Sequence, residues 1–382
     1  MTDKIDFSSL AIGQAEKTYV DEVLSGRMMS GDGAFTMRCQ SLLEDALSVP
    51  KVFLTHSCTA ALEMAARLVE LGPGDEVIVP SYTFSSTANA IVLTGATPVF
   101  CDVREDDLNI DISKVVELIT PKTKALFVTH YAGRSPDMVS LKELTQAKGI
   151  PIVEDAAQSL GATYLGRPAG RSGAMSTFSF HETKNVVSGE GGALAIVDDT
   201  YIERAAIIRE KGTNRSAFLE GHVDKYTWVD LGSSYLPSEL IAAVLHGQLE
   251  REGLITQRRR QIYQRYADGL QALKAHGLQY PALDTDTVQA NGHIFFMLLP
   301  EARQRAEFMN RMKSRGVITT FHYLPLHSAP AGLKFGRAPT GCPVTEDVAS
   351  RLVRLPMHMN LSDTDCDTVV ESVLGVFEEV FL

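Results

Sequence analysis

Residues 151–158 read Pro-Ile-Val-Glu-Asp-Ala-Ala-Gln, a short apolar run that ends in two acidic residues. Such a run is typical of a buried strand whose last residues reach the edge of a sheet. Similar runs stand at residues 51–54, 76–80, 97–101 and 124–129, with helical patterns over residues 60–70 and 86–93. Strands that alternate with helices predict an α/β fold with a mixed, mostly parallel sheet.

The rest of the chain predicts a second, smaller domain. Strands over residues 176–180 and 192–197 enclose a polar loop, and beyond residue 200 the pattern becomes mostly helical. Expected there are helices over 251–273, 301–315 and 363–381 and strands over 293–299 and 317–322. We therefore expect a large domain over residues 1–250 and a small α+β domain over residues 251–382. The first 25 residues predict an amphipathic helix that could join either domain.

The composition is that of an ordinary globular protein. The chain has 382 residues, of which 45% are hydrophobic and 22% are charged. These values exclude a disordered chain, a collagen-like fibre and a coiled coil. The net charge of −11 argues against general binding to nucleic acid or to an anionic membrane, because both attract basic proteins. A phosphorylated ligand would therefore need a local site that binds it against the overall charge.

The cysteines and the apolar segments indicate a cytoplasmic protein. The five cysteines are scattered and form no C-x-x-C pair, which fits a reducing compartment better than a disulfide framework or a zinc site. No segment suits a signal peptide or a membrane span. His181 and Glu182 lack a third ligand at a suitable spacing, so we expect no metal site.

Small polar residues stand between a strand and a helix at Ser57, Cys58 and Thr59. The start of a helix offers free backbone N–H groups and the positive end of the helix dipole, and both bind phosphate well. The same residue types also suit ordinary capping of a helix. On their own, these residues leave both interpretations open.

Asp155 closes the apolar strand at the carboxyl edge of the expected sheet, where α/β proteins bind their ligands. A carboxylate there can pair with a cationic ring nitrogen, or it can simply cap the next helix. The alternation of side chains along a strand sends the neighbouring Glu154 to the opposite face.

Two further residues follow strand ends. Lys184 lies in the loop between the strands at 176–180 and 192–197. A lysine held in a partly dry site has a lowered pKa and becomes nucleophilic, whereas an ordinary loop lysine is solvated. Phe84 can stack on a flat ligand ring or belong to the core.

An amine, a carboxylate and a phosphate cup are together what pyridoxal 5'-phosphate (PLP) requires. In this hypothesis Lys184 bonds to the cofactor as a Schiff base, and Asp155 keeps the ring nitrogen protonated. Once released, Lys184 would move the proton of the substrate carbon.

Six blocks of sequence in this order resemble the sugar-nucleotide aminotransferases of the DegT/StrS type. They read SCTAALEMA, GDEVIVPSYTFSSTANAI, GATPVFCDV, VEDAAQSLGATYLGR, FSFHETKN with GEGGAL, and YLPLH. The resemblance runs from about residue 25 to the end of the chain. It implies a fold-type I PLP-dependent aminotransferase that acts as a homodimer with active sites at the interface.

The resemblance also implies a role for each site residue. Lys184 would carry the cofactor, Asp155 would pair with the pyridine nitrogen, Gln158 would contact the ring hydroxyl, and Phe84 would stack on the ring. The phosphate would lie at Ser57, Cys58, Thr59 and Ser179. The family usually adds an Asn from the neighbouring subunit, but Ser234 stands at that position here. That contact is therefore either absent or shorter and bridged by water.

For the reaction, the resemblance implies transfer of the amino group of L-glutamate, through the pyridoxamine form of the cofactor, to a keto sugar nucleotide. The expected substrate is dTDP-4-keto-6-deoxy-D-glucose, and the expected product is dTDP-4-amino-4,6-dideoxy-D-galactose. Candidate substrate contacts are His322, Tyr323, His327, the loop at 28–33, and Lys225 with Tyr226 from either chain. For each of them packing or solvation is an equal alternative, and the basic run at 258–260 is expected to be a solvated helix face.

Four alternatives stay open. The enzyme could act at another carbon or on a UDP or GDP sugar, or it could be a PLP-dependent sugar dehydratase. Dehydratases of this fold carry His in place of the lysine, so Lys184 opposes that assignment. A non-catalytic binding protein would not need Lys184 and Asp155 together. A nucleotide-dependent dehydrogenase would need G-x-G-x-x-G between a strand and a helix, which the sequence lacks.

Overall fold

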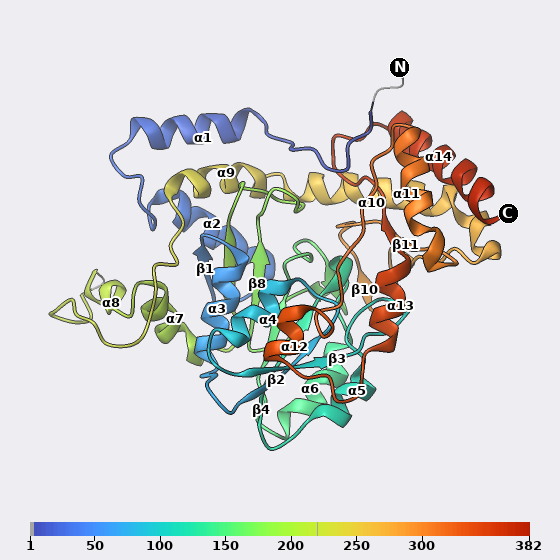
Figure 1. The fold of residues 1–382 in the computed structure, drawn as a ribbon. Coiled ribbons are helices and arrows are strands. Elements are labelled where there is room, and N and C mark those ends of the chain that lie inside the picture. The colour runs from blue at the N-terminus through green and yellow to red at the C-terminus, as the bar shows by residue number, and fades with distance from the viewer. Residues whose placement is uncertain (1–3, 220) are drawn as a thin grey trace.

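A seven-stranded sheet forms the centre of the computed structural model, which describes residues 4–219 and 221–382 (Figure 1). The strand order is β1-β9-β8-β5-β4-β2-β3. Strands β3, β2, β4, β5 and β8 pair in parallel, whereas β9 runs antiparallel to both of its neighbours. The strands are β1 (Lys51–Thr55), β2 (Glu76–Pro80), β3 (Thr97–Cys101), β4 (Thr123–Thr129), β5 (Ile152–Asp155), β8 (Met175–Ser179) and β9 (Gly192–Ile196). The expectation of an α/β fold with a mixed, mostly parallel sheet is confirmed.

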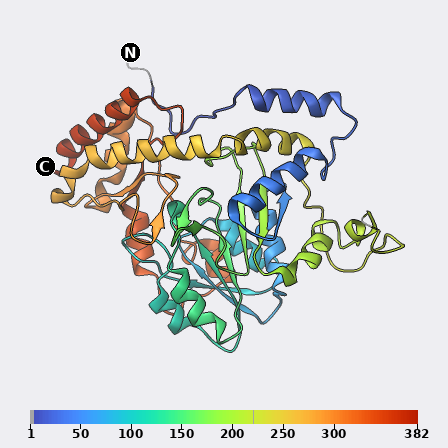
Figure 2. The same ribbon diagram turned by 180° about the vertical axis from the view of Figure 1, so that it is seen from behind.

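Helices cover both faces of this sheet (Figures 1 and 2). One face packs against α3 (Cys58–Leu68), α4 (Ser85–Val92) and α7 (Ile202–Arg209). The other packs against α2 (Ala34–Leu47), α5 (Ile112–Leu118), α6 (Met138–Gln146) and α9 (Glu239–Leu249). Side chains alternate between the faces, so Val77 and Val79 meet the first layer and Ile78 meets the second. Burial on both sides explains why the strands read as continuous apolar runs.

A second hydrophobic core lies in the C-terminal part. It is built from α10 (Glu252–Gly269), α11 (Arg305–Ser314), α14 (Asp363–Phe381), β11 (Phe296–Leu298) and β12 (Leu352–Arg354). Helices α9 and α10 are separate, with a break at residues 250–251. The break lies close to the boundary that we expected between the large and small domains, near residue 250. The boundary itself stays a prediction.

The expected strand at 293–299 is only Phe296–Leu298, and the expected helix at 251–273 ends as an α-helix at Gly269. Two other expected elements differ more. The N-terminal helix α1 spans only Gln14–Ser25 and packs on α9, while Ile5 in the extended segment before it joins the second core. Residues 317–322 do not form a strand. They make only single bridges, Val317 to Ile5 and Thr320 to Arg354, and the chain then leaves for the large sheet.

The remaining elements are short connections. The strands are β6 (Thr163–Tyr164), β7 (Arg167–Pro168) and β10 (Val288–Gln289). The 3-10 helices are η1 (Tyr131–Gly133), η2 (Asp199–Tyr201), η3 (Gln271–His276) and η4 (Ala302–Gln304). The α-helices are α8 (Arg215–Leu219), α12 (Pro330–Phe335) and α13 (Pro343–Arg351). No helix within the described ranges is both long and apolar enough to cross a lipid bilayer.

The chain after residue 320 returns to the large sheet and completes the site. The backbone N–H of Leu326 donates to the carbonyl oxygen of Ser81 at 3.0 Å, just beyond the end of β2. The N–H of Phe100 in β3 donates to the carbonyl oxygen of Arg337 at 2.8 Å. These bonds hold His322 and Tyr323 over the carboxyl ends of the parallel strands, where α/β folds bind ligands.

Candidate active site

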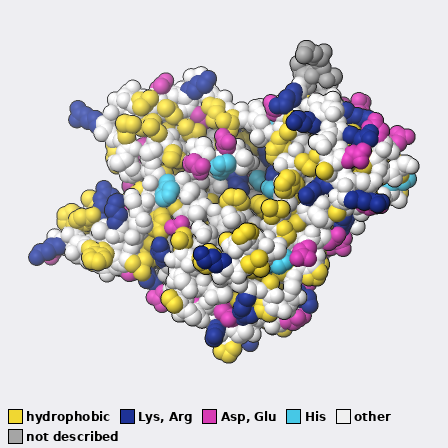
Figure 3. All heavy atoms as spheres, viewed as in Figure 1, with side chains coloured by type: hydrophobic (Ala, Val, Ile, Leu, Met, Phe, Trp, Pro, Cys, Tyr) yellow, Lys and Arg dark blue, Asp and Glu magenta, His cyan; other side chains and the backbone are white. Residues whose placement is uncertain are grey.

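The segments that follow β1, β2, β4, β5 and β8 enclose a cavity of about 500 Å³. In Figure 3 this face of the molecule is hollowed near its centre, and His, Lys and Arg side chains are visible inside the hollow. The expected site residues that line the cavity are Ser57, Cys58, Thr59, Phe84, Asp155, Gln158, Ser179, Lys184, His322 and Tyr323. One cavity therefore brings together the amine, the acid and the helix start.

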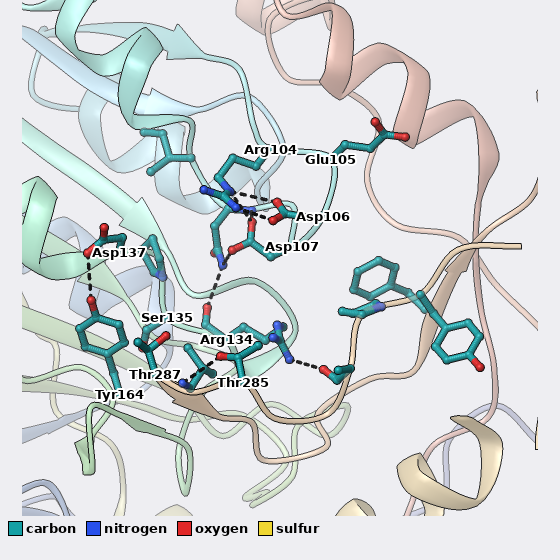
Figure 4. A pocket seen from close by; sticks show the side chains of 18 of the residues that line it. Arg104, Glu105, Asp106, Asp107, Arg134, Ser135, Asp137, Tyr164, Thr285 and Thr287 are labelled. Atoms are coloured by element: carbon teal, nitrogen blue, oxygen red, sulfur yellow. Dashed lines mark hydrogen bonds and ion pairs between the residues drawn. The ribbon is translucent and has the colours of Figure 1, made fainter. Parts of the chain in front are cut away.

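A larger cavity, of about 800 Å³, opens elsewhere between the large sheet and the chain before β11 (Figure 4). Its charged side chains already have partners. Arg104 pairs with Asp106, Asp137 accepts a hydrogen bond from the hydroxyl of Tyr164 at 2.9 Å, and Arg134 donates to two backbone carbonyl oxygens. No lysine is among the described residues that line it, so amine chemistry belongs to the smaller cavity.

Asp155 is buried and ends a line of hydroxyl groups. The hydroxyl of Thr87 donates to its Oδ2 at 2.6 Å, and the N–H of Ala157 donates to its Oδ1 at 3.2 Å. Thr87 Oγ1 lies 3.1 Å from Thr83 Oγ1, which lies 2.8 Å from Thr129 Oγ1. Because each hydroxyl has one proton, the donors must run from Thr129 through Thr83 and Thr87 to the carboxylate. Aligned hydroxyls strengthen one another and hold the carboxylate of Asp155 fixed in direction.

We expect Thr87→Val to weaken cofactor binding about 5- to 30-fold, since a buried acceptor that loses its donor costs about 1–2 kcal/mol. Valine keeps the shape of threonine and removes only the hydroxyl. Thr87→Ser is the matched control and should restore most of the affinity. Absorbance titration of the protein with PLP measures the dissociation constant. Equal affinity in the valine variant and the wild type would show that the hydroxyl line does not support Asp155.

Glu154, the residue next to Asp155, faces the other side of the sheet as the alternation of β5 predicts. Its Oε1 accepts hydrogen bonds from the N–H groups of Ser172 and Gly173 at 2.7 and 2.6 Å. Its Oε2 lies 2.9 Å from Nε2 of the buried His130. Glu154 does not line the cavity, so Asp155 is the acid of the site.

Lys184 lies in the loop between β8 and β9, where its N–H donates to the carbonyl oxygen of His181 at 2.9 Å. Burial lowers the pKa of its amine, while Cys58 and Asp155 act in the opposite direction. A lower pKa leaves a larger neutral fraction of the amine near neutral pH, and the neutral amine is the nucleophile.

The start of α3 lines the same cavity as Lys184. The Ser57 hydroxyl accepts from the N–H of Ala60 at 3.1 Å, and the Thr59 hydroxyl lies 2.8 Å from that of Ser86. A Cβ at Gly192 would lie 2.4 Å from the backbone nitrogen of Cys58, so only glycine allows β9 to approach the helix so closely. Burial raises the pKa of the Cys58 thiol to about 12, and this cysteine is therefore an inert wall.

The walls of the cavity are aromatic and polar. Phe84 is 57% exposed and lines the cavity, so its ring is available to stack on a flat ligand. Gln158 accepts from the N–H of Ala132 at 2.7 Å and donates to the hydroxyl of Tyr323 at 2.9 Å. The ring of Tyr323 stacks on that of His322 with centroids 4.1 Å apart.

Residues 10–374 match the DegT/DnrJ/EryC1/StrS aminotransferase family. The chain belongs to this family. The spore coat polysaccharide biosynthesis protein SpsC of Bacillus subtilis is 32% identical over 384 residues, covering 97% of both chains. The dTDP-4-dehydro-2,3,6-trideoxy-D-glucose 4-aminotransferase of Saccharopolyspora spinosa is 32% identical over 326 residues, covering 84% of this chain and 83% of its own. The aminotransferase TlmJ from Streptoalloteichus hindustanus superposes with a TM-score of 0.91 and 32% identity, covering 99% of this chain and 100% of its own.

Sugar aminotransferases of this family depend on PLP, and the cavity fits that cofactor. Asp155 is buried, yet within the described ranges no Lys, Arg or His nitrogen lies within 4.0 Å of its carboxylate. A buried carboxylate without a cationic partner suits the protonated ring nitrogen of PLP, because an unpaired buried charge is costly. Lys184, the start of α3 and the exposed ring of Phe84 line the same cavity and would meet the aldehyde, the phosphate and the ring face. These individual roles stay predictions.

Several expected substrate residues, and Ser234, the expected phosphate contact from the second copy, do not line the cavity of this aminotransferase. His327 is bound between Ser81, at 2.7 Å, and Glu346, at 3.1 Å. Lys225, Tyr226 and Ser234 are exposed at or near the segment that projects around α8. Whether they reach the site of a second copy stays a prediction. The loop at 28–33 is tied to α9, since Glu239 accepts from the N–H of Gly33 at 3.1 Å.

The expectation of a solvated basic face at residues 258–260 is wrong for Arg259. Its side chain is only 4% exposed, and its guanidinium donates to the carbonyl oxygens of Gly292 and His293. Burial lowers the pKa of Arg259 to about 9. The residue serves as an internal donor that holds the chain entering β11.

Sequence reasoning missed three residues that shape the cavity. Thr87 sits inside α4 and gives no signal beyond an ordinary helical threonine. His293 lines the cavity with its Nδ1 2.9 Å from Asn185 Oδ1, and burial holds its pKa well below the usual value. Arg354 is the last residue of β12 and also lines the cavity. A charge that ends an apolar strand was the one available signal, as it was for Asp155.

Proposed function

We propose that this aminotransferase transfers the amino group of L-glutamate to the 4-keto carbon of dTDP-4-keto-6-deoxy-D-glucose, giving dTDP-4-amino-4,6-dideoxy-D-galactose. The observation that carries the reaction type is that Lys184 and Asp155 line one cavity. The substrate is supported by the sequence blocks quoted above. The relative from Saccharopolyspora spinosa adds support, because its name describes amination at carbon 4 of a dTDP sugar.

PLP, once bound, would supply an electron-poor ring that stabilises negative charge at the carbon bearing the amine. Asp155 would keep the proton on the ring nitrogen, with its direction set by the hydroxyl of Thr87. The amine of Lys184 would accept the proton from the reacting carbon and return it to a neighbouring atom. The phosphate would lie at the start of α3, and the side chains of Gln158 and Tyr323 would confine the ring.

We also propose a homodimer whose active sites lie at the interface, in the cytoplasm. Leu219, Tyr226 and Trp228 are 66%, 53% and 78% exposed on the projecting segment. Exposed apolar groups gathered in this way are typical of a surface that another protein covers. Lys225, Tyr226 and Ser234 of the second copy would then reach this cavity. All five cysteines are free, as expected in a reducing compartment.

The test is to incubate the PLP-loaded enzyme with dTDP-4-keto-6-deoxy-D-glucose and L-glutamate and to analyse the product by mass spectrometry and NMR. We expect a sugar nucleotide with an amine at carbon 4 in the galacto configuration, together with 2-oxoglutarate. Parallel reactions use 3-keto sugar nucleotides and UDP and GDP keto sugars as alternative substrates. An amine at carbon 3, or turnover only of another nucleotide sugar, would replace the proposed substrate. A product that has lost oxygen without gaining nitrogen would indicate a dehydratase.

A further inference from the structure

The chain ahead of α1 forms a strap, residues 4–13, that runs along the second core (Figure 1). Near its start, Ile5 belongs to that core and makes a single bridge to Val317. Two residues further on, the backbone N–H of Met357 donates to the carbonyl oxygen of Phe7 at 3.4 Å. The strap is therefore bound to the segment that follows β12, beside the cavity.

The far end of the strap is bound as well. The side-chain amide of Asn360 donates to the carbonyl oxygen of Leu10 at 3.0 Å. The side-chain amide of Gln248, in α9, donates to the carbonyl oxygen of Ala11 at 2.9 Å. Because hydrogen bonds hold the backbone at both ends, the side chains between them keep a defined place.

Between these two anchors the strap brings Phe7 to the cavity. Its side chain is half-buried and lines the cavity together with Lys184. The guanidinium of Arg354 lies over the ring, 4.8 Å from its centroid, and orients it. Burial lowers the pKa of the Lys184 amine, and the charge of Arg354 acts in the same direction. Arg354 is thus near both residues, and Phe7 borders the reacting end of the cavity.

The proposed function gives no role to Phe7, although it is an apolar surface in a mostly polar cavity. Within the described ranges, the large apolar side chains that line the cavity are Phe7, Leu62 and Phe84. Leu62 is 1% exposed inside α3, and Phe84 is proposed for the cofactor ring. The carboxylates of L-glutamate and the diphosphate of a sugar nucleotide gain nothing from a phenyl ring. The apolar parts of a 6-deoxy sugar are the C–H groups of its ring and the methyl group at carbon 6.

We propose that Phe7 packs against carbon 6 of the acceptor sugar and selects a methyl group there over a hydroxymethyl group. This inference rests on the proposed function and deepens it, because it names the residue that distinguishes a 6-deoxy sugar. Carbon 6 is two bonds from carbon 4, so it must lie close to the reacting nitrogen, where Phe7 lines the cavity. A methyl group loses little beside an aromatic ring, whereas a hydroxyl group there gives up its hydrogen bonds to water.

The kinetic test compares Phe7→Ala, Phe7→Leu and Phe335→Ala in the PLP-loaded enzyme. Phe335, on α12, is the matched control: it is 44% exposed, lies outside the cavity and has the Nζ of Lys334 4.8 Å from its ring centroid. We expect Phe7→Ala to raise the KM for dTDP-4-keto-6-deoxy-D-glucose about 5- to 30-fold. Its single-turnover rate with L-glutamate should stay within about threefold of the wild type, because that half-reaction involves no sugar. Phe7→Leu should fall between, and Phe335→Ala should match the wild type.

A binding measurement tests the selection at carbon 6 without turnover. dTDP-6-deoxy-D-galactose and dTDP-D-galactose differ only in the oxygen at carbon 6, and neither has a carbonyl group at carbon 4 to react. By calorimetry with the enzyme in its pyridoxamine phosphate form, we expect the wild type and Phe335→Ala to bind the 6-deoxy compound about tenfold more tightly. Phe7→Ala should reduce this ratio to less than about threefold. Melting temperatures check that each variant folds.

Three results would overturn the role of Phe7. They are an unchanged ratio in Phe7→Ala, equal binding of the two compounds by the wild type, and a loss confined to the half-reaction with L-glutamate. The product analysis judges the proposed function separately. If the wild type aminates a different keto sugar nucleotide, the proposed substrate fails, and an unchanged KM of Phe7→Ala for that sugar would overturn the contact as well. If it aminates none, both proposals fail.

Discussion

Lys184→Ala should lower the rate of amino transfer by about 10³-fold or more. The substitution removes both the amine that would carry the cofactor and the base that would move the proton, and a positioned base alone contributes about 10²–10⁴-fold. No other amine can replace that of Lys184, because no other lysine is among the described residues that line the cavity. Steady-state formation of 2-oxoglutarate from L-glutamate measures the effect.

Lys313→Ala is the control for this variant. Lys313 is exposed on α11 and lies outside the cavity, so its loss should leave the rate within about twofold of the wild type. The alanine variant at 184 should still bind pyridoxamine phosphate, since Asp155 and the start of α3 are unchanged. Turnover by Lys184→Ala within tenfold of the wild type would rule out this lysine as the catalytic amine.

Asp155→Ala should lower the rate by about 10²–10³-fold and weaken cofactor binding as well. Among the described residues that line the cavity, Asp155 has the one buried carboxylate, and preorganised charges in dry sites contribute about this much. Asp155→Asn should keep much of the cofactor affinity, because the amide oxygen can still accept from Thr87. Its rate should nevertheless fall by about as much as the rate of Asp155→Ala. Single-turnover kinetics with L-glutamate and titration with PLP measure the two effects separately.

Glu154→Gln is the matched control for Asp155. Glu154 is the next residue in β5 and equally buried, but it binds backbone N–H groups on the other face of the sheet. Its substitution should lower the melting temperature and leave cofactor affinity unchanged. If Glu154→Gln impaired cofactor binding as much as Asp155→Asn, the charge at residue 155 would have no special role.

The strands of the large sheet were predictable because burial on both faces leaves a clear pattern. The expected strands at 76–80 and 97–101 coincide with β2 and β3, and the expected helix at 363–381 coincides with α14. The Ser362 capping box marks the start of that helix in the sequence. The cofactor side of the site was also predictable, because parallel strands bring their carboxyl ends to one edge. Asp155 is such an end, and Ser57 and Lys184 each follow one.

The substrate side of the site could not be predicted in the same way. Arg354 comes from a strand of the second core, and it reaches the cavity only because the chain after residue 320 is bound to the ends of β2 and β3. Its place at the end of an apolar run does not tell that it reaches the cavity, and the more deeply buried Arg259 instead donates to backbone carbonyl oxygens. Residues 317–322 have the composition of a strand, yet their partners Ile5 and Arg354 pair with them at single points. Long-range pairing of this kind has no signal within a window of sequence.

Reduction of the PLP-loaded protein with borohydride, followed by peptide mass spectrometry, tests the central claim most directly. The protein should be yellow before reduction, and the mass of the reduced cofactor should appear on the peptide that contains Lys184 and on no other. A variant with alanine at Asp155 should label less at equal cofactor concentration, because it binds the ring less tightly. Labelling of a different lysine, or none at all, would contradict the assignment of this cavity as the site of amino transfer.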